Sequence, residues 1–287
     1  MLRVQSVPAL SRLAAIAAVV AATACSDKSS TDVVRSSPQG LSRINHVIII
    51  YLENHSFDNT YAEFPGAAGL PEAVNAPKQV DSTGAVYANL PQTTGAPFPI
   101  SPALPNAPFP IQQYMSSTQA PRDLVHRFYQ EQLQIDGGRM DRFAAISDAK
   151  GLVMGYYHTS GLPLAAEASR YTLMDHFFHS AFGGSFLNHI FLIAAAPPVF
   201  PNAPASIVAQ LDAQGNLVKD GQVTPDGYVV NTSFTVNAPH PASANPATLV
   251  PNQTMPTVGD RLNDKGVSWA WYSGGWNDAN AGHPDPT

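Results

Sequence analysis

The predicted fold rests on the stretch Ile44-Asn45-His46-Val47-Ile48-Ile49-Ile50-Tyr51-Leu52-Glu53-Asn54-His55-Ser56-Phe57-Asp58. Residues 47–52 form a continuous apolar run, mostly β-branched, without alternating polar residues. A short run of this kind predicts a strand buried on both faces of a parallel sheet. Glu53 and Asn54 follow directly, and ligands of open α/β sheets bind at the carboxyl ends of the strands. These two side chains indicate either a divalent-cation site built from oxygen donors or an ordinary solvated strand end.

A second stretch contains two glycines, a serine and an apolar helical run, in the order Phe177-Phe178-His179-Ser180-Ala181-Phe182-Gly183-Gly184-Ser185-Phe186-Leu187-Asn188-His189-Ile190-Phe191-Leu192-Ile193-Ala194-Ala195. Glycine lets the backbone turn sharply and approach a ligand closely. Ser185 is expected to open the helix, where backbone N–H groups and the helix dipole favour an anion. By itself, a Gly-Gly-Ser sequence before an apolar helix is most often only an N-cap.

Taken together, the two stretches resemble the bacterial phosphoesterase family that contains acid phosphatases and phospholipases C, within the alkaline-phosphatase-like superfamily. The matching motifs are Leu52-Glu53-Asn54-His55-Ser56-Phe57-Asp58 and Gly183-Gly184-Ser185-Phe186-Leu187-Asn188-His189. The resemblance runs from about residue 44 to the last residues, and the Gly-Gly-Ser context looks closer to the acid phosphatase branch. It implies an α/β fold with a mostly parallel sheet and helices on both faces.

The resemblance also implies the chemistry, which is that of a metal-dependent phosphoric ester hydrolase acting on a small phosphate ester. Glu53, Asn54 and Ser185 are expected to bind a divalent metal ion, whose identity the sequence does not determine. Ser185 is the expected nucleophile and would form a phosphoserine, because metal coordination lowers the pKa of a hydroxyl. His126 is the expected second catalytic residue, since the family has a histidine at the phosphate in this context. A lone histidine is otherwise more often a helix-surface or core residue.

Three other interpretations remain open. One is a phospholipase C that acts on phospholipid head groups, and another is a truncated, non-catalytic exported protein. A third is a serine hydrolase, because Asp175, His176 and His179 precede Ser185. The elbow of such enzymes needs Gly-x-Ser-x-Gly, and Leu187 stands where its second glycine belongs. The serine hydrolase is therefore the least favoured of the three.

Composition narrows the class of protein. Of the 287 residues, 44% are hydrophobic, 13% are charged and 26 are proline. This composition is typical of a folded, loop-rich exported protein. The net charge of −6 gives no electrostatic reason to expect a nucleic-acid partner. A single cysteine excludes an internal disulfide.

The N-terminus predicts export. Residues 1–25 have a basic start, a short apolar core and small residues before Cys25, as a signal peptide does. Cys25 is either the lipidated residue of a lipoprotein, which would attach the protein to a membrane, or an incidental cysteine after ordinary cleavage. Residues 26–40 are polar and predict a flexible tether. The expected location is the periplasm, the outer membrane as a lipoprotein, or the medium.

Residues 41–287 are expected to be the N-terminal portion of a phosphoesterase domain with Pro-rich insertions. The family has a pair of adjacent aspartates and further histidines later in the chain, and this sequence has no Asp-Asp pair. We therefore expect a domain that is incomplete at its C-terminus, and a 287-residue chain that is inactive and poorly stable by itself.

Periodicity and turn residues predict the other elements. Residues 171–178 and 267–272 are predicted strands, and a small β-hairpin is expected within residues 197–256. The Pro-rich segment 59–117 is predicted to be an ordered surface excursion near the mouth of the site. Arg139 is a phosphate donor by type but more typical of a solvated loop. Helices are predicted at residues 123–133, shortly after Arg139, at 162–169 and at 257–265.

Overall fold

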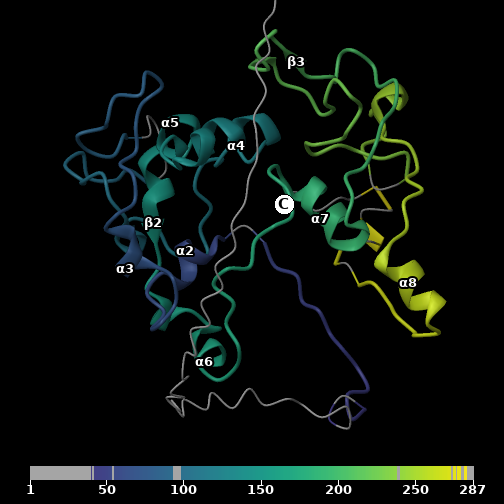
Figure 1. The fold of residues 1–287 in the computed structure, drawn as a ribbon, viewed down its shortest axis with the longest axis horizontal. Coiled ribbons are helices and arrows are strands. Elements are labelled where there is room, and N and C mark those ends of the chain that lie inside the picture. Colours follow the sequence, from purple (N-terminus) through teal and green to yellow (C-terminus); the bar gives the residue numbers. More distant parts are fainter. Residues whose placement is uncertain are drawn as a thin grey trace, which may run out of the picture. The chain divides into compact units, whose positions relative to one another are not determined.

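The structure is a computed structural model that describes residues 40, 42–53, 55–92, 98–237, 240–272, 274–275, 277–278 and 281–282 (Figure 1). It divides into two units, residues 1–51 and residues 52–287. Asn54, the signal peptide with Cys25, and most of the tether lie outside the described residues. The predictions made for those segments therefore stay predictions.

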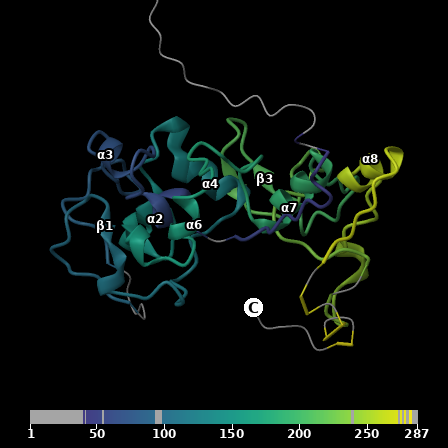
Figure 2. The ribbon, with the colours of Figure 1, turned by 90° about the horizontal axis from the view of Figure 1, so that it is seen from below.

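The second unit consists of short helices and small sheets joined by long loops (Figures 1 and 2). Its described helices are α2 (Phe57–Tyr61), α3 (Leu70–Ala73), α4 (Phe128–Ile135), α5 (Phe143–Ile146), α6 (Ala165–Ala168), α7 (Ser185–Ala194) and α8 (Val258–Asp264). Short 3-10 turns occur at η1 (Ile111–Gln113), η2 (Asp136–Gly138), η3 (Lys150–Met154), η4 (Thr159–Gly161) and η5 (Pro246–Thr248). Its strands are β1 (Phe109–Pro110), β2 (Gly155–Tyr156), β3 (Gln210–Leu211) and β4 (Leu217–Lys219).

The first hydrophobic core is built largely from the Pro-rich segment. Strand β1 pairs in parallel with β2, and Gly155 fits there because an added Cβ would lie 2.6 Å from the Ile111 side chain. The buried members of this cluster are Leu90, Ile100, Phe109, Ile111, Met115, Ala149, Leu152 and Tyr157. The prediction of a surface excursion is therefore wrong for the described residues of the segment that belong to this core.

Asn106 explains how so irregular a segment can be buried. Its side chain accepts a hydrogen bond from the Gln79 N–H at 3.0 Å and donates to the Gln79 and Tyr87 carbonyls at 2.8 and 3.0 Å. One buried amide thus satisfies backbone groups that a sheet would otherwise pair. Such side-chain pairing is not visible in a proline count, which is why the prediction failed.

A second core is formed mainly by residues of the segment 200–250. The antiparallel strands β3 and β4 form the small hairpin that the sequence predicted. Val223, Val229 and Val250 are the buried members of this cluster, and Phe186 of α7 packs against it. Helix α7 also contacts α8 (Figures 1 and 2). This core therefore positions the helix that begins at Ser185.

Three predicted strands are wrong. Residues 47–52, 171–178 and 267–272 contain no strand in the structure, and Val47 to Ile50 are 78 to 83% exposed. A buried strand needs ladder partners and cover on both faces, and an apolar run specifies neither. The described parallel sheet has only the two strands β1 and β2, so the chain is a mixture of helices and small sheets.

The helix predictions succeed to different extents. Helix α8 follows Thr257, whose hydroxyl forms a capping box with Asp260, so this prediction is confirmed. Helices α5 and α6 lie where expected but are short. Helix α4 starts at Phe128 rather than residue 123 because Val125 has φ +56°, which interrupts a helix. Within the described part of the chain, no helix has the length and apolar character needed to cross a bilayer.

Candidate functional site

Ser185 is the first residue of α7, as the sequence predicted, and it follows a turn formed by residues 181–184, here called the serine turn. Gly183 adopts φ +121°, a conformation that favours glycine. A Cβ on Gly184 would lie 3.0 Å from the His126 carbonyl oxygen and 3.3 Å from its ring. The two glycines are thus needed for a turn that passes close to other backbone. Ser185 lies at the helix N-terminus, where free N–H groups favour an anion.

Asn188 holds the serine turn from within α7. Its side-chain N–H group lies 3.1 Å from the Ala181 carbonyl oxygen, 3.2 Å from that of Gly183 and 3.4 Å from that of Gly184, and it donates to them. Its amide oxygen accepts from the Ala181 N–H at 3.3 Å. Asn188 is buried, so these bonds are shielded from water and rigidify the turn.

Glu53 lies beside α7. The Glu53 carboxylate is 3.3 Å from Nε2 of His189, and both side chains are about one-third exposed, at 34% and 40%. His189 follows Ser185 by four residues, and residues four apart lie on the same face of a helix. The structure therefore brings the first motif to the face of α7 that carries Ser185. Asn54, the third predicted ligand, lies outside the described residues.

His126 lies against the serine turn, because its carbonyl and its ring both face the Gly184 backbone. Its Nδ1 is 3.1 Å from the Asp123 carboxylate, which fixes the ring's orientation. The predicted catalytic histidine therefore lies against Gly184, the residue before Ser185. A ring N–H at this position can donate to an anion bound at the helix N-terminus.

The rest of the first motif has a structural role. Ser56 caps α2 by accepting a hydrogen bond from the Asn59 N–H at 3.1 Å. The Asn59 side chain in turn donates to the carbonyl of Gly155 in β2 at 2.8 Å. His55 packs edge-on against Tyr157, with ring centroids 6.0 Å apart. The motif is thus anchored to the first core directly after Glu53.

Asp175 and Arg139, two of the residues considered for other chemistry, have partners elsewhere. Asp175 accepts a hydrogen bond from the Ala68 N–H at 2.8 Å, and this bond lowers the pKa of the Asp175 carboxyl. This carboxylate therefore orders a loop. Arg139 pairs with Asp136, and its Nε is 3.5 Å from Asp141, so its charge is already balanced.

The donor set fits one side of a divalent-cation site. Glu53 offers a carboxylate and Ser185 a hydroxyl, while the His189 ring lies beside the carboxylate and can orient it. These are donor types that divalent metals accept. Among the described residues, however, no three His, Cys, Asp or Glu side chains cluster closely enough to hold a metal ion.

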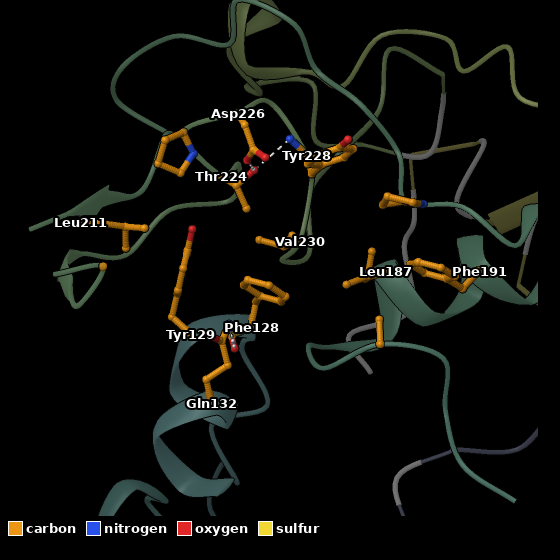
Figure 3. A pocket seen from close by; sticks show the side chains of 14 residues that line it. Phe128, Tyr129, Gln132, Leu187, Phe191, Leu211, Thr224, Asp226, Tyr228 and Val230 are labelled. Carbon is orange, nitrogen blue, oxygen red and sulfur yellow. Dashed lines mark hydrogen bonds between the residues drawn. The ribbon is translucent and has the colours of Figure 1, made fainter. Parts of the chain in front are cut away.

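A cavity of about 610 Å³ lies beside α7 (Figure 3). Leu187 and Phe191 line it, and Leu187 is about 200° from Ser185 around the helix at 3.6 residues per turn. Its other walls come from α4 and the loops around residues 211–230, and Asp226 is its only acidic lining residue in the part described. An apolar wall with a carboxylate does not suit a phosphate group. The cavity and the predicted chemistry are therefore on different faces of α7.

Comparison with protein families gives a match to the model of the phosphoesterase family over residues 44–286. The chain belongs to the phosphoesterase family. The match includes both motifs, so the predicted family is confirmed. No curated protein matches this phosphoesterase.

Sequence reasoning missed three residues of this phosphoesterase. His189 and Asn188 belong to the second motif, and their spacing from Ser185 was the available signal, since residues three and four apart on a helix are neighbours. Glu131 accepts a hydrogen bond from the Gly183 N–H at 2.7 Å. No local pattern identifies Glu131, because its partner comes from a distant part of the chain.

Proposed function

We propose that this phosphoesterase is an acid-phosphatase-like phosphomonoesterase with Ser185 as its nucleophile. The observation that carries the proposal is the contact between Glu53 and His189, because it joins the two family motifs on the helix face that begins with Ser185. The position of His126 against Gly184 supports it further. The alkaline-phosphatase-like fold is part of the proposal and is supported by the family match and the parallel pair of β1 and β2.

Each residue has a distinct role in the proposed reaction. Ser185 Oγ attacks phosphorus, the bond from phosphorus to the leaving oxygen breaks, and the hydroxyl proton is lost to solvent while the leaving oxygen takes one up. Water then hydrolyses the phosphoserine and releases phosphate. His126 and the N–H groups that open α7 donate to the phosphoryl oxygens. Glu53, Asn54 and Ser185 would hold a divalent metal ion, which supplies positive charge that favours the serine alkoxide.

Replacing Ser185 by alanine tests the proposal. In a preparation of the protein that turns over p-nitrophenyl phosphate with Mn²⁺, we expect this activity to fall on the order of 1,000-fold or more, because removing a nucleophile usually costs at least that much. The melting temperature should not change, since the hydroxyl is not the turn's support. Bis(p-nitrophenyl) phosphate distinguishes a monoesterase from the phospholipase C alternative, because only a diesterase cleaves it rapidly.

Ser169→Ala is the matched control, since Ser169 is an exposed serine at the end of α6 whose hydroxyl donates to the Ala166 carbonyl. It should keep wild-type turnover. If Ser185→Ala and Ser169→Ala turn over equally, Ser185 is not the nucleophile. If wild type has no turnover above either variant, this chain lacks the proposed activity.

We propose in addition that the protein is exported and that Cys25 is its lipidation site. The support is the order of basic, apolar and small residues in the first 25 positions. Cell fractionation of wild type and Cys25→Ser tests both parts. Wild type in the cytosol at full length contradicts export, and equal release of both proteins contradicts lipidation.

A further inference from the structure

Glu131 connects α4 to the serine turn. It lies in the first turn of α4, and its Oε2 accepts a hydrogen bond from the Gly183 N–H at 2.7 Å. Gly183 precedes Ser185 by two residues. A hydrogen bond to a carboxylate is shorter and stronger than one between neutral groups. Glu131 therefore fixes the backbone from which the nucleophile's helix starts.

The Gly183 backbone needs such a partner. Its φ of +121° turns the chain sharply, and a Cβ there would lie 3.0 Å from the Val230 carbonyl oxygen. The Asn188 side chain engages the carbonyl oxygens of Gly183 and Gly184. Glu131 engages the N–H of Gly183, so the two residues hold opposite polar groups of the same turn. Without Glu131, a partly buried donor would lose its acceptor.

Helix α4 is itself fixed, so it can act as a support. The N–H of Phe128, which opens α4 and has no partner within the helix, donates to the Asn231 side chain at 2.9 Å. The Asn231 amide donates in turn to the Gly221 carbonyl at 2.6 Å. Asn231 is only 1% exposed. The start of the helix that carries Glu131 is thus tied through buried Asn231 to the backbone at Gly221.

The same helix also delivers His126. His126 lies two residues before α4 and faces Gly184. We propose that Glu131 is a positioning residue, and this inference rests on the proposed function. Glu131 places Ser185 by fixing the Gly183 N–H, and it keeps the serine turn against His126. It does not touch the substrate.

Three substitutions separate the hydrogen bond from the charge. Glu131→Gln keeps a neutral acceptor at the same reach, Glu131→Asp keeps the charge but is shorter by about 1.5 Å, and Glu131→Ala removes both. Because a nucleophile displaced by about 1 Å can cost 100-fold in rate, we expect kcat to fall about 100-fold in Glu131→Ala with little change in KM. Glu131→Gln should restore most of kcat, and Glu131→Asp should restore less.

Amide hydrogen exchange of Gly183, measured by NMR, tests the contact independently of activity. Exchange should be slow in wild type and Glu131→Gln and fast in Glu131→Ala. The matched control is Glu167→Ala, an exposed glutamate in the first turn of α6, which should leave both readouts unchanged. If wild type shows no Ser185-dependent turnover but the exchange pattern is as expected, the proposed function is contradicted and the contact between Glu131 and Gly183 is not.

Two results overturn the positioning role. One is a Glu131→Asp variant with a higher kcat than Glu131→Gln, which would mean that Glu131 acts through its charge. The other is slow Gly183 exchange in Glu131→Ala, which would mean that the turn does not depend on this acceptor. A melting curve of each variant shows whether it is folded. If Glu131→Ala is not folded, Glu131→Gln and Glu131→Asp still test the proposal.

Discussion

At the scale of residues, the contact between Glu53 and His189 is the one on which the candidate site depends. A carboxylate that is one-third exposed has several rotamers of similar energy, and a partner at 3.3 Å selects one of them. Partners of metal ligands usually affect affinity or activity by 10- to 100-fold, even without touching the metal. His189 is thus expected to matter although no catalytic role is assigned to it.

We predict that His189→Ala weakens Mn²⁺ binding by about 10- to 100-fold and lowers kcat by a similar factor, because the Glu53 carboxylate loses the group that orients it. An EPR titration with Mn²⁺ measures the affinity. His158→Ala is a matched control, since His158 also lies 3.0 Å from a glutamate, Glu63. Equal Mn²⁺ affinity of both variants would contradict the prediction.

Glu131 gives a prediction on pH. Burial raises the pKa of the Glu131 carboxyl, and the Gly183 N–H and the charge of His126 oppose this effect. A raised folded-state pKa means that the folded protein binds the proton more tightly than the unfolded chain, so ionisation costs stability at neutral pH. As the pH falls toward the ordinary value of 4.5, the free energy of unfolding of wild type should rise relative to Glu131→Gln. Urea unfolding from pH 7 to 4.5 measures it, and a constant difference contradicts the cause.

At the scale of elements, the serine turn and α7 act as one unit. Asn188 and Glu131 satisfy its polar backbone groups, while Phe186 attaches the helix to the second core. The two faces of α7 have different surroundings, since His189, four residues after Ser185, lies beside Glu53 and the opposite face lines the apolar cavity. Substitutions on the cavity face of α7 can therefore be tested separately from substitutions on the face that carries Ser185 and His189.

We predict that Gly184→Ala lowers kcat by about 10-fold or more, because its Cβ would press on the His126 carbonyl at 3.0 Å and displace either the histidine or the start of α7. The φ of Gly184 is −76°, so the effect is steric and does not come from backbone strain. Gly161→Ala is the control, since a Cβ there meets nothing within 4 Å. Wild-type kcat in Gly184→Ala would show that the turn has room to shift.

At the scale of the whole molecule, two separate cores support the chain. The first contains the parallel pair β1 and β2, and the second supports α7. Large apolar side chains remain exposed elsewhere, including Phe177 at 74%, Phe178 at 77% and Tyr272 at 91%. Stability therefore depends on a modest number of buried residues, many of which lie in loops.

Leu90 tests that dependence. Leu90 is 2% exposed. A Cβ added at Gly151 would lie 2.8 Å from the Leu90 Cβ, so the surroundings of Leu90 are tightly packed. We predict that Leu90→Ala lowers the free energy of unfolding by about 2–5 kcal/mol, as buried leucines usually do. Val218→Ala, in β4 and 66% exposed, should change it by less than about 0.5 kcal/mol. Similar urea midpoints for the two variants would mean that the first core does not unfold in the same transition as the rest of the protein.

The sequence by itself determined the family, the start of α7 at Ser185, and the capped helix α8. Each family motif and each of the two helix starts depends on residues within a few positions of each other, such as the hydroxyl of Thr257 and the carboxylate of Asp260 in one capping box. The Gly-Gly-Ser turn is local in the same sense. Such interactions occur wherever their few residues occur, so motif and pattern are sufficient to predict them.

The tertiary structure alone decided which distant segments meet. The contacts of Glu53 with His189, of His126 with Gly184 and of Glu131 with Gly183 each join segments far apart in the sequence. For the same reason the apolar run of residues 47–52 predicted a buried strand that the structure does not contain. An apolar run shows that burial is favourable, but hydrogen-bond partners and covering side chains are supplied by other segments, and only packing selects them.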